Sequence, residues 1–67
     1  MKDLWTMWIY RANGDLWDRI EGKEVELREQ GVGFTTGRGQ MTWRCSLRKN
    51  GRHVADCKRG VWKDTTP

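Results

Sequence analysis

Two Asn-Gly pairs, Asn13-Gly14 and Asn50-Gly51, constrain the fold of this chain more than any other sequence feature. Each pair follows a run in which aromatic, aliphatic and polar residues alternate, and a second such run comes after it. Both residues of an Asn-Gly pair adopt positive φ readily, so this pattern is the strongest short-range signal for a β-hairpin. The sequence therefore predicts two hairpins, one around each pair.

The first hairpin is predicted to have one aliphatic and one aromatic face. A two-residue turn at Asn13-Gly14 places Trp8 opposite Arg19 and Tyr10 opposite Trp17. These four residues form an aromatic platform with an arginine at its edge, which suits cation–π contact. The aliphatic face suits a core. Because apolar area is the main favourable term in folding, most of the five tryptophans are also expected to serve the core.

The second hairpin is predicted to have one apolar and one cationic face, because the two residue classes alternate from 41 to 48. A two-residue turn at Asn50-Gly51 places Leu47 opposite Val54 and Cys45 opposite Asp56. A slip of one residue would exchange the two faces. Trp62 is expected to close a last short strand, and residues 63–67 are expected to form a frayed tail.

The segment between the hairpins fits two structures. Residues 24–29 alternate polar and apolar, which favours a strand, and this is our preferred interpretation. A helix around residues 15–30, with Asp15 as N-cap and Gly31 as its stop, is the alternative. We expect residues 1–67 to form a single, mainly β domain of five to six short strands. The strands would form a small antiparallel sheet or an open SH3-like or Sm-like barrel, and an α+β fold is the alternative.

The glycine-rich stretch at residues 31–40, GVGFTTGRGQ, is predicted to be a loop. It lacks the Gly-Lys-Ser/Thr ending of a P-loop and the glycine spacing of a dinucleotide-binding motif. A hairpin loop over residues 36–39 with Arg38 at its tip is the better interpretation, because glycine permits the backbone angles of tight turns.

The cysteines, the acidic residues and the single histidine give little support for a catalytic site or a metal site. No signal peptide or membrane-spanning segment is evident, so we expect a soluble, cytoplasmic protein in which Cys45 and Cys57 are free thiols. A disulfide between them remains an alternative if the register brings them together. His53 with these cysteines lacks the usual spacing of a zinc site. No nucleophile has a base and an orienting group beside it, so we expect neither a cofactor nor an enzyme.

Charge is divided unevenly along the chain. Residues 1–30 carry five basic and seven acidic residues, whereas residues 31–67 carry eight basic and two acidic residues. Such asymmetry points first to a nucleic-acid partner, although pairing of acidic and basic strands across a sheet would also explain it. We predict a small non-enzymatic module that binds single-stranded DNA or RNA through phosphate contacts and base stacking. The predicted contact residues are Arg38, Arg44, Arg48, Lys49, Arg52, Arg59, Trp8 and Trp17.

Docking to a protein is the alternative function. Tryptophan and arginine are the residues that interface hot spots favour. The apolar run from Leu4 to Tyr10 can add a strand to a partner or to a second copy, so a homodimer is also considered. By composition alone, the chain has the style of a small accessory protein or inhibitor of phages and mobile elements.

Overall fold

The computed structural model describes residues 3–65 and contains five strands and one helix within that range. In chain order these are β1 (Trp5–Tyr10), β2 (Leu16–Gly22), α1 (Glu24–Thr36), β3 (Arg44–Lys49), β4 (Arg52–Lys58) and β5 (Val61–Asp64).

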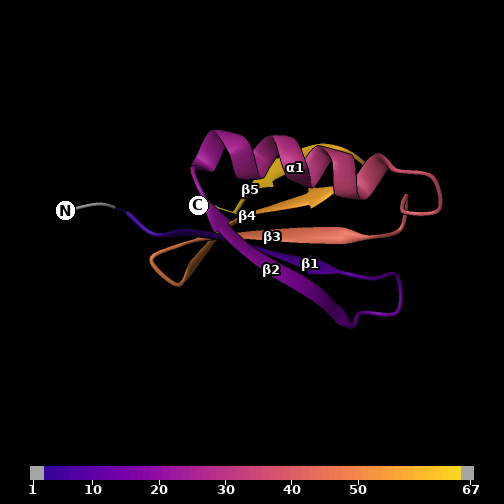
Figure 1. Cartoon of the computed structure of the whole chain (residues 1–67), viewed down its shortest axis with the longest axis horizontal. Coiled ribbons are helices and arrows are strands. Elements are labelled where there is room, and N and C mark those ends of the chain that lie inside the picture. Colours follow the sequence, from indigo (N-terminus) through magenta and orange to yellow (C-terminus); the bar gives the residue numbers. More distant parts are fainter. Residues whose placement is uncertain (1–2, 66–67) are drawn as a thin grey trace.

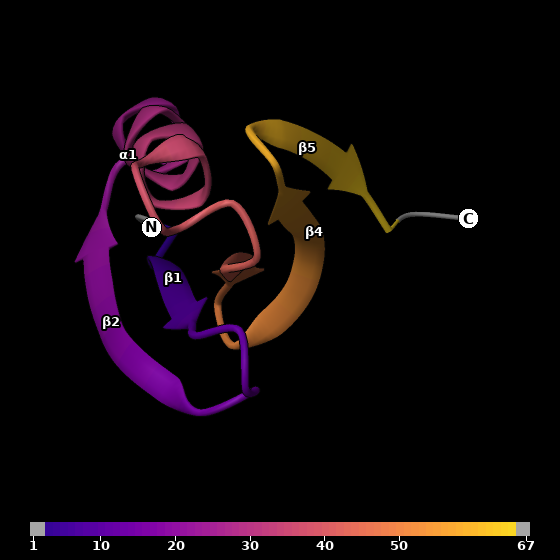
Figure 2. The ribbon, with the colours of Figure 1, turned by 90° about the vertical axis from the view of Figure 1, so that its right-hand side faces the viewer.

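The strands form one antiparallel sheet in the order β2-β1-β3-β4-β5, and α1 lies against one of its faces (Figure 1). Seen from its end, the sheet curves around the helix, with β2 on one side and β4 and β5 on the other (Figure 2). The prediction of a mainly β fold built on two hairpins is confirmed. However, β1 is paired on both sides, so the run from Leu4 to Tyr10 is not the free edge that the sequence suggested.

The first hairpin has a wider turn than expected. The Arg11 N–H donates to the Asp15 carbonyl at 2.9 Å, and the Gly14 N–H donates to the Arg11 carbonyl at the same distance. Trp8 pairs with Arg19 as predicted, but Tyr10 pairs with Leu16. The predicted pairing of Tyr10 with Trp17 is wrong, because a β-bulge places Trp17 as an extra residue in β2.

The second hairpin also contains a bulge. The turn at Asn50-Gly51 has two residues, with positive φ of 52° and 81°, as the sequence predicted. Beyond it the register shifts, because Val54 is an extra residue in β4. Leu47 therefore pairs with Ala55 and Cys45 with Cys57, so both pairings predicted for Leu47 and Cys45 are wrong.

Residues 24–36 form the helix, so the preferred strand over 24–29 is wrong. The helix of the alternative interpretation exists, but it begins after Lys23 and continues through Gly31. Leu27, Gly31 and Thr35 are its buried residues, four apart, and this stripe contains only one large apolar side chain. These three residues are nevertheless buried, because Gly31 lets α1 approach β5 closely.

Gly31 is required for that approach. A Cβ at this position would overlap the Trp62 ring and lie 3.2 Å from the Met7 Sδ. The indole N–H of Trp62 donates to the Arg28 carbonyl at 2.8 Å, which ties β5 to the helix. Residues 63–67 are therefore not simply a frayed tail. β5 extends to Asp64, the Thr65 N–H donates to the Val54 carbonyl at 3.0 Å, and residues 66–67 lie outside the described range.

The core lies between α1 and the sheet. Its buried apolar residues are Met7, Ile9, Leu27, Cys45, Leu47, Ala55 and Cys57. Trp5, Trp43 and Trp62 pack against this core half-buried, whereas Trp8 lies on the opposite face of the sheet. The expectation that most of the five tryptophans pack in the core is therefore confirmed for three of them. Across residues 3–65, no helix has the length and apolar character needed to span a membrane.

Candidate functional site

The sheet face that α1 does not cover, here called the outer face, is the best candidate for a functional site. Residues in register across an antiparallel sheet share a face, so the pairings order this face into rows. The first row, nearest the turn of residues 11–15, contains Leu16, Tyr10, Arg44, Lys58 and Val61. The second row contains Arg19, Trp8, Ser46, Asp56 and Lys63.

A groove of about 920 Å³ runs over this face, bounded on one side by the turn at residues 11–14 and on the other by β5. Its lining includes five basic residues and one acidic residue, namely Arg11, Arg44, Arg48, Lys58, Lys63 and Asp56. The lining therefore carries a formal charge of +4, with His53 neutral. The whole chain also has a formal net charge of +4, so the residues outside the groove balance to zero.

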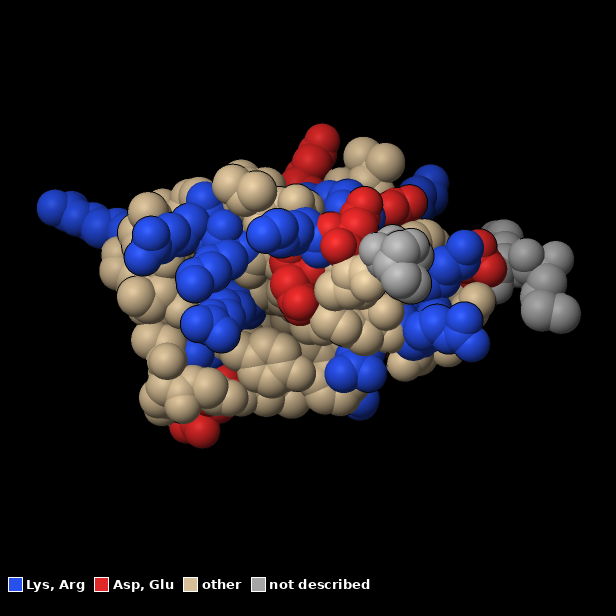
Figure 3. Space-filling model, turned by 180° about the vertical axis from the view of Figure 1, so that it is seen from behind, with Lys and Arg blue, Asp and Glu red and all other residues tan. Residues whose placement is uncertain are grey.

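Basic side chains gather densely on this side of the molecule. Figure 3, seen from behind, shows lysine and arginine side chains grouped toward the end that lies away from the N-terminus. Within the first row, Arg44 and Lys58 are direct cross-strand partners. Like charges placed directly opposite each other destabilise a sheet. Among residues 3–65, neither side chain has an acidic partner within 4.0 Å.

Two guanidinium groups lie close to the ring of Trp8. The Arg48 Cζ lies 5.0 Å and the Arg19 Cζ 5.7 Å from the Trp8 ring centroid, which is cation–π geometry. Within the described structure, the buried Arg48 Nε has no hydrogen-bond partner. Trp8 therefore contacts two arginines that share the outer face with it.

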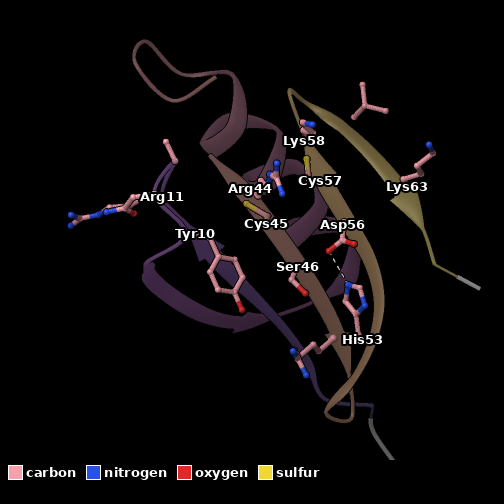
Figure 4. A pocket seen from close by; sticks show the side chains of 15 residues that line it. Tyr10, Arg11, Arg44, Cys45, Ser46, His53, Asp56, Cys57, Lys58 and Lys63 are labelled. Carbon is pink, nitrogen blue, oxygen red and sulfur yellow. Dashed lines mark hydrogen bonds and ion pairs between the residues drawn. The ribbon is translucent and has the colours of Figure 1, made fainter. Parts of the chain in front are cut away.

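Tyr10 is the aromatic side chain that lines the groove itself. It comes from the end of β1 and is half-buried, beside Arg44 in the same row. Figure 4 shows its ring lying over the groove on the side of Ser46. A half-exposed phenol ring on a sheet surface can stack with a planar ligand while its hydroxyl stays in water.

The only acid of the groove lining is paired with the only histidine of the chain. The His53 Nε2 lies 2.8 Å from the Asp56 Oδ1, and the two side chains are 38% and 55% exposed (Figure 4). The bulge at Val54 brings them onto one face, because His53 and Asp56 are three residues apart and would otherwise point to opposite faces. Ser46, directly opposite Asp56, lies almost buried on the groove floor.

The structure brings together only some of the predicted contact residues. Arg44 and Arg48 line the groove, and Trp8 makes a cation–π contact with Arg48. The others lie outside the lining: Arg38 in the connector between α1 and β3, Lys49 against Trp5 and Asp3, Arg52 beside the second hairpin turn, Arg59 in the β4–β5 turn, and Trp17 against Phe34 and Trp43.

The position of Arg38 also corrects the loop prediction. Residues 31–36 belong to α1, and the chain turns only from Gly37, whose N–H donates to the Gly33 carbonyl at 3.1 Å. The connector of residues 37–43 then joins a helix to a strand rather than two strands of a hairpin. The glycine-rich stretch is therefore half helix and half connector.

Sequence reasoning missed Arg11, Lys58, Lys63 and the direct role of Tyr10 in the groove. Lys58 was missed because the bulge at Val54, which brings it onto the face of Arg44, was not recognised. Lys63 was assigned to the tail. The alternation of Asp56, Lys58 and, beyond the turn, Lys63 was the available signal, since it marks a polar face that continues into a fifth strand.

The two cysteines lie on the opposite, helix-covered face. Both are free and buried. Burial, reinforced by the neighbouring Cys57, raises the pKa of the Cys45 thiol to about 12. Burial also raises the pKa of Cys57, although a hydrogen bond with Thr35 opposes this. Within residues 3–65, no three His, Cys, Asp or Glu residues are grouped so that they could hold a metal ion.

Comparisons with protein-family models, with curated proteins and with solved structures give no match to this chain. The interpretation of the outer face therefore depends on its residues alone.

Proposed function

We propose that this protein binds single-stranded nucleic acid in the groove of its outer face, and that it does so without catalysis. The observation that carries the proposal is the charge of that groove, which equals the net charge of the whole chain. Phosphate contacts by lysine and arginine supply most of the affinity of non-specific nucleic-acid binding. A polyanion would also relieve the repulsion between Arg44 and Lys58, neither of which has an acidic partner within 4.0 Å among residues 3–65.

A single strand fits this surface better than a duplex. Tyr10 offers a ring in the same groove as the cations, and stacking of a base on an aromatic side chain is worth about 1 to 3 kcal/mol. Stacking requires an unpaired base, which a duplex does not present. Within residues 3–65 no helix protrudes from this sheet face, so it lacks the helix that many DNA-binding modules insert into a major groove.

Fluorescence anisotropy with a short labelled oligonucleotide of mixed sequence tests this proposal. We expect binding at low salt and a plot of log affinity against log salt with a slope between about −2 and −4, because each phosphate contact on a single strand contributes about 0.7. Arg44→Gln with Lys58→Gln should weaken binding roughly tenfold and reduce the slope by about 1.4. Absence of binding by the wild-type protein at low salt would refute the proposal.

The matched control changes the same charge outside the groove. Lys23→Gln with Arg52→Gln also removes two exposed cations, one before α1 and one beside the second hairpin turn. This variant should retain most of the wild-type affinity and slope. An equal loss in both double variants would mean that net charge alone attracts the strand and that the groove is not the site.

Docking to a protein is a second candidate, favoured by one specific observation. Trp17 exposes 42% of its surface and packs against Phe34 and Trp43 at centroid distances of 5.6 and 5.4 Å. Exposed aromatic clusters of this kind mark protein interfaces. A pull-down from the native cell should then retain one stoichiometric protein that resists nuclease digestion and is lost with Trp17→Ala. Retention of the same protein by Trp17→Ala would exclude this cluster as its binding site.

A further inference from the structure

We infer that the groove prefers strands containing guanine, and that the Asp56 carboxylate recognises the base. This inference rests on the proposed binding of single strands. Asp56 is the one carboxylate among five cations in the groove lining, where it opposes phosphate binding. Besides its pairing with His53 and its position opposite Lys63, it can contact the part of a nucleotide that donates hydrogen bonds.

Asp56 is held in place for such a contact. His53 binds the Oδ1 atom at 2.8 Å, and 55% of the Asp56 side chain remains exposed to solvent. A carboxylate has about four acceptor sites on its two oxygens, so the bond to His53 leaves most of them free. The side chain is thus oriented but not saturated.

Asp56 borders the groove between Ser46 on β3 and Lys63 on β5. Ser46 is its direct cross-strand partner and has a small side chain on the groove floor. Tyr10 lies diagonally across from Ser46 on the next strand, at a separation of about 7 to 8 Å. Figure 4 shows Tyr10, Ser46 and the His53–Asp56 pair arranged in this order across β1, β3 and β4. A base lying over Ser46 can therefore pack against the Tyr10 ring and turn one edge to Asp56.

Guanine is the base whose edge matches a carboxylate best. Its Watson–Crick edge presents two adjacent donors, N1–H and the N2 amino group, which face the two oxygens of one carboxylate as an arginine fork does. Adenine and cytosine each present one amino donor beside an acceptor, and that acceptor would face the carboxylate oxygen. Thymine and uracil present a single donor between two acceptors.

The test compares the affinity of the protein for oligothymidine strands that carry one central dG, dA, dC or deoxyinosine, measured by anisotropy. We expect the dG strand to bind at least about fivefold more tightly than plain oligothymidine. Deoxyinosine, which lacks the N2 amino group, should lose most of that advantage. Equal affinity for all strands would refute the guanine inference and leave the proposed function standing, whereas no binding to any strand would refute both.

Asp56→Asn separates base recognition from charge. Asparagine cannot accept two hydrogen bonds from one guanine edge, so the dG preference should disappear. The same change raises the groove charge by one unit, so binding of plain oligothymidine should strengthen or stay the same. Asp18→Asn, which changes the same charge outside the groove lining, should leave the dG preference intact. The inference would be overturned if the Asp56→Asn variant kept the dG preference. It would also be overturned if the deoxyinosine strand bound as tightly as the dG strand.

Discussion

The two faces of the single sheet follow opposite rules. On the face under α1, the register partners Leu47 and Ala55 are buried and apolar, as are Cys45 and Cys57. On the outer face, the next pair of the same two strands places Arg44 directly opposite Lys58. One face therefore supplies the stability of a domain of only 67 residues. The other face carries a cross-strand pair of like charges that lowers the stability, and binding of an anion would offset that loss.

The largest difference between the faces should appear at adjacent positions of β3. Leu47→Ala removes a fully buried side chain and should lower the free energy of unfolding by about 2 to 5 kcal/mol. A domain of this size has roughly 3 to 10 kcal/mol in total, so this variant should be close to unfolding. Ser46→Ala, one residue away on the outer face, should change it by less than about 1 kcal/mol. Urea denaturation measures both, and similar losses would contradict the division.

The second largest effect should appear at alkaline pH. Below pH 9 the Cys45 thiol is protonated in the folded and the unfolded chain, so its contribution to stability is complete. Above pH 9 the unfolded chain releases the proton, while burial keeps it on the folded chain until about pH 12. The free energy of unfolding should therefore fall with rising pH, by up to about 1.4 kcal/mol per pH unit from this group.

Cys45→Ala provides the control for that titration. The variant lacks the buried thiol, so its stability should fall less steeply above pH 9 than that of the wild type, whatever its absolute stability. Urea denaturation at several pH values between 8 and 11 would show this difference in slope. Parallel curves for the two proteins would mean that the Cys45 thiol is not protected by the fold.

A third effect tests how α1 closes the covered face. Gly31→Ala places a methyl group against the Trp62 ring and should cost about 1 to 3 kcal/mol of overpacking, less the gain in helix propensity. Gly33→Ala lies in the same helix, with no atom within 4 Å of the new methyl group, and should stabilise by up to about 1 kcal/mol. Thermal denaturation distinguishes the two signs. A stabilising Gly31→Ala would show that α1 and β5 are not packed as closely as described.

The sequence predicted the hairpins well because Asn-Gly turns are local signals. It placed the second turn and the pairing of Trp8 with Arg19 correctly. The prediction from sequence failed where contacts between distant parts of the chain determine the structure. The buried stripe of α1 contains Gly31 and Thr35, which carry no helical hydrophobic signal, and their burial depends on Trp62 and Cys57 from distant strands.

The candidate site could be predicted only in part for a related reason. Arg44 and Arg48 were found because β3 alternates regularly. The bulges at Trp17 and Val54 each add an extra residue, one to β2 and one to β4, and the bulge at Val54 reverses the predicted faces of the residues that follow it. This is why the sequence predicted Trp17 opposite Tyr10 and did not predict Lys58 as a groove residue. A bulge depends on the fit of neighbouring strands, and neither bulged residue is a glycine that would have marked it.

The smallest predicted effect distinguishes the outer face most clearly, because two similar lysines should respond with opposite signs. Lys58→Gln removes the repulsion with Arg44 and should raise the free energy of unfolding by about 0.2 to 1 kcal/mol. Lys63 lies opposite Asp56, so Lys63→Gln removes an attraction and should lower it by a similar amount. Both differences should shrink at high salt, because these side chains are exposed to solvent and screened. Chemical denaturation by urea, which adds no ions, measures them at low and high salt. If Lys58→Gln were destabilising, the first row would be contributing to the fold, and the main energetic argument for an anionic ligand there would be lost.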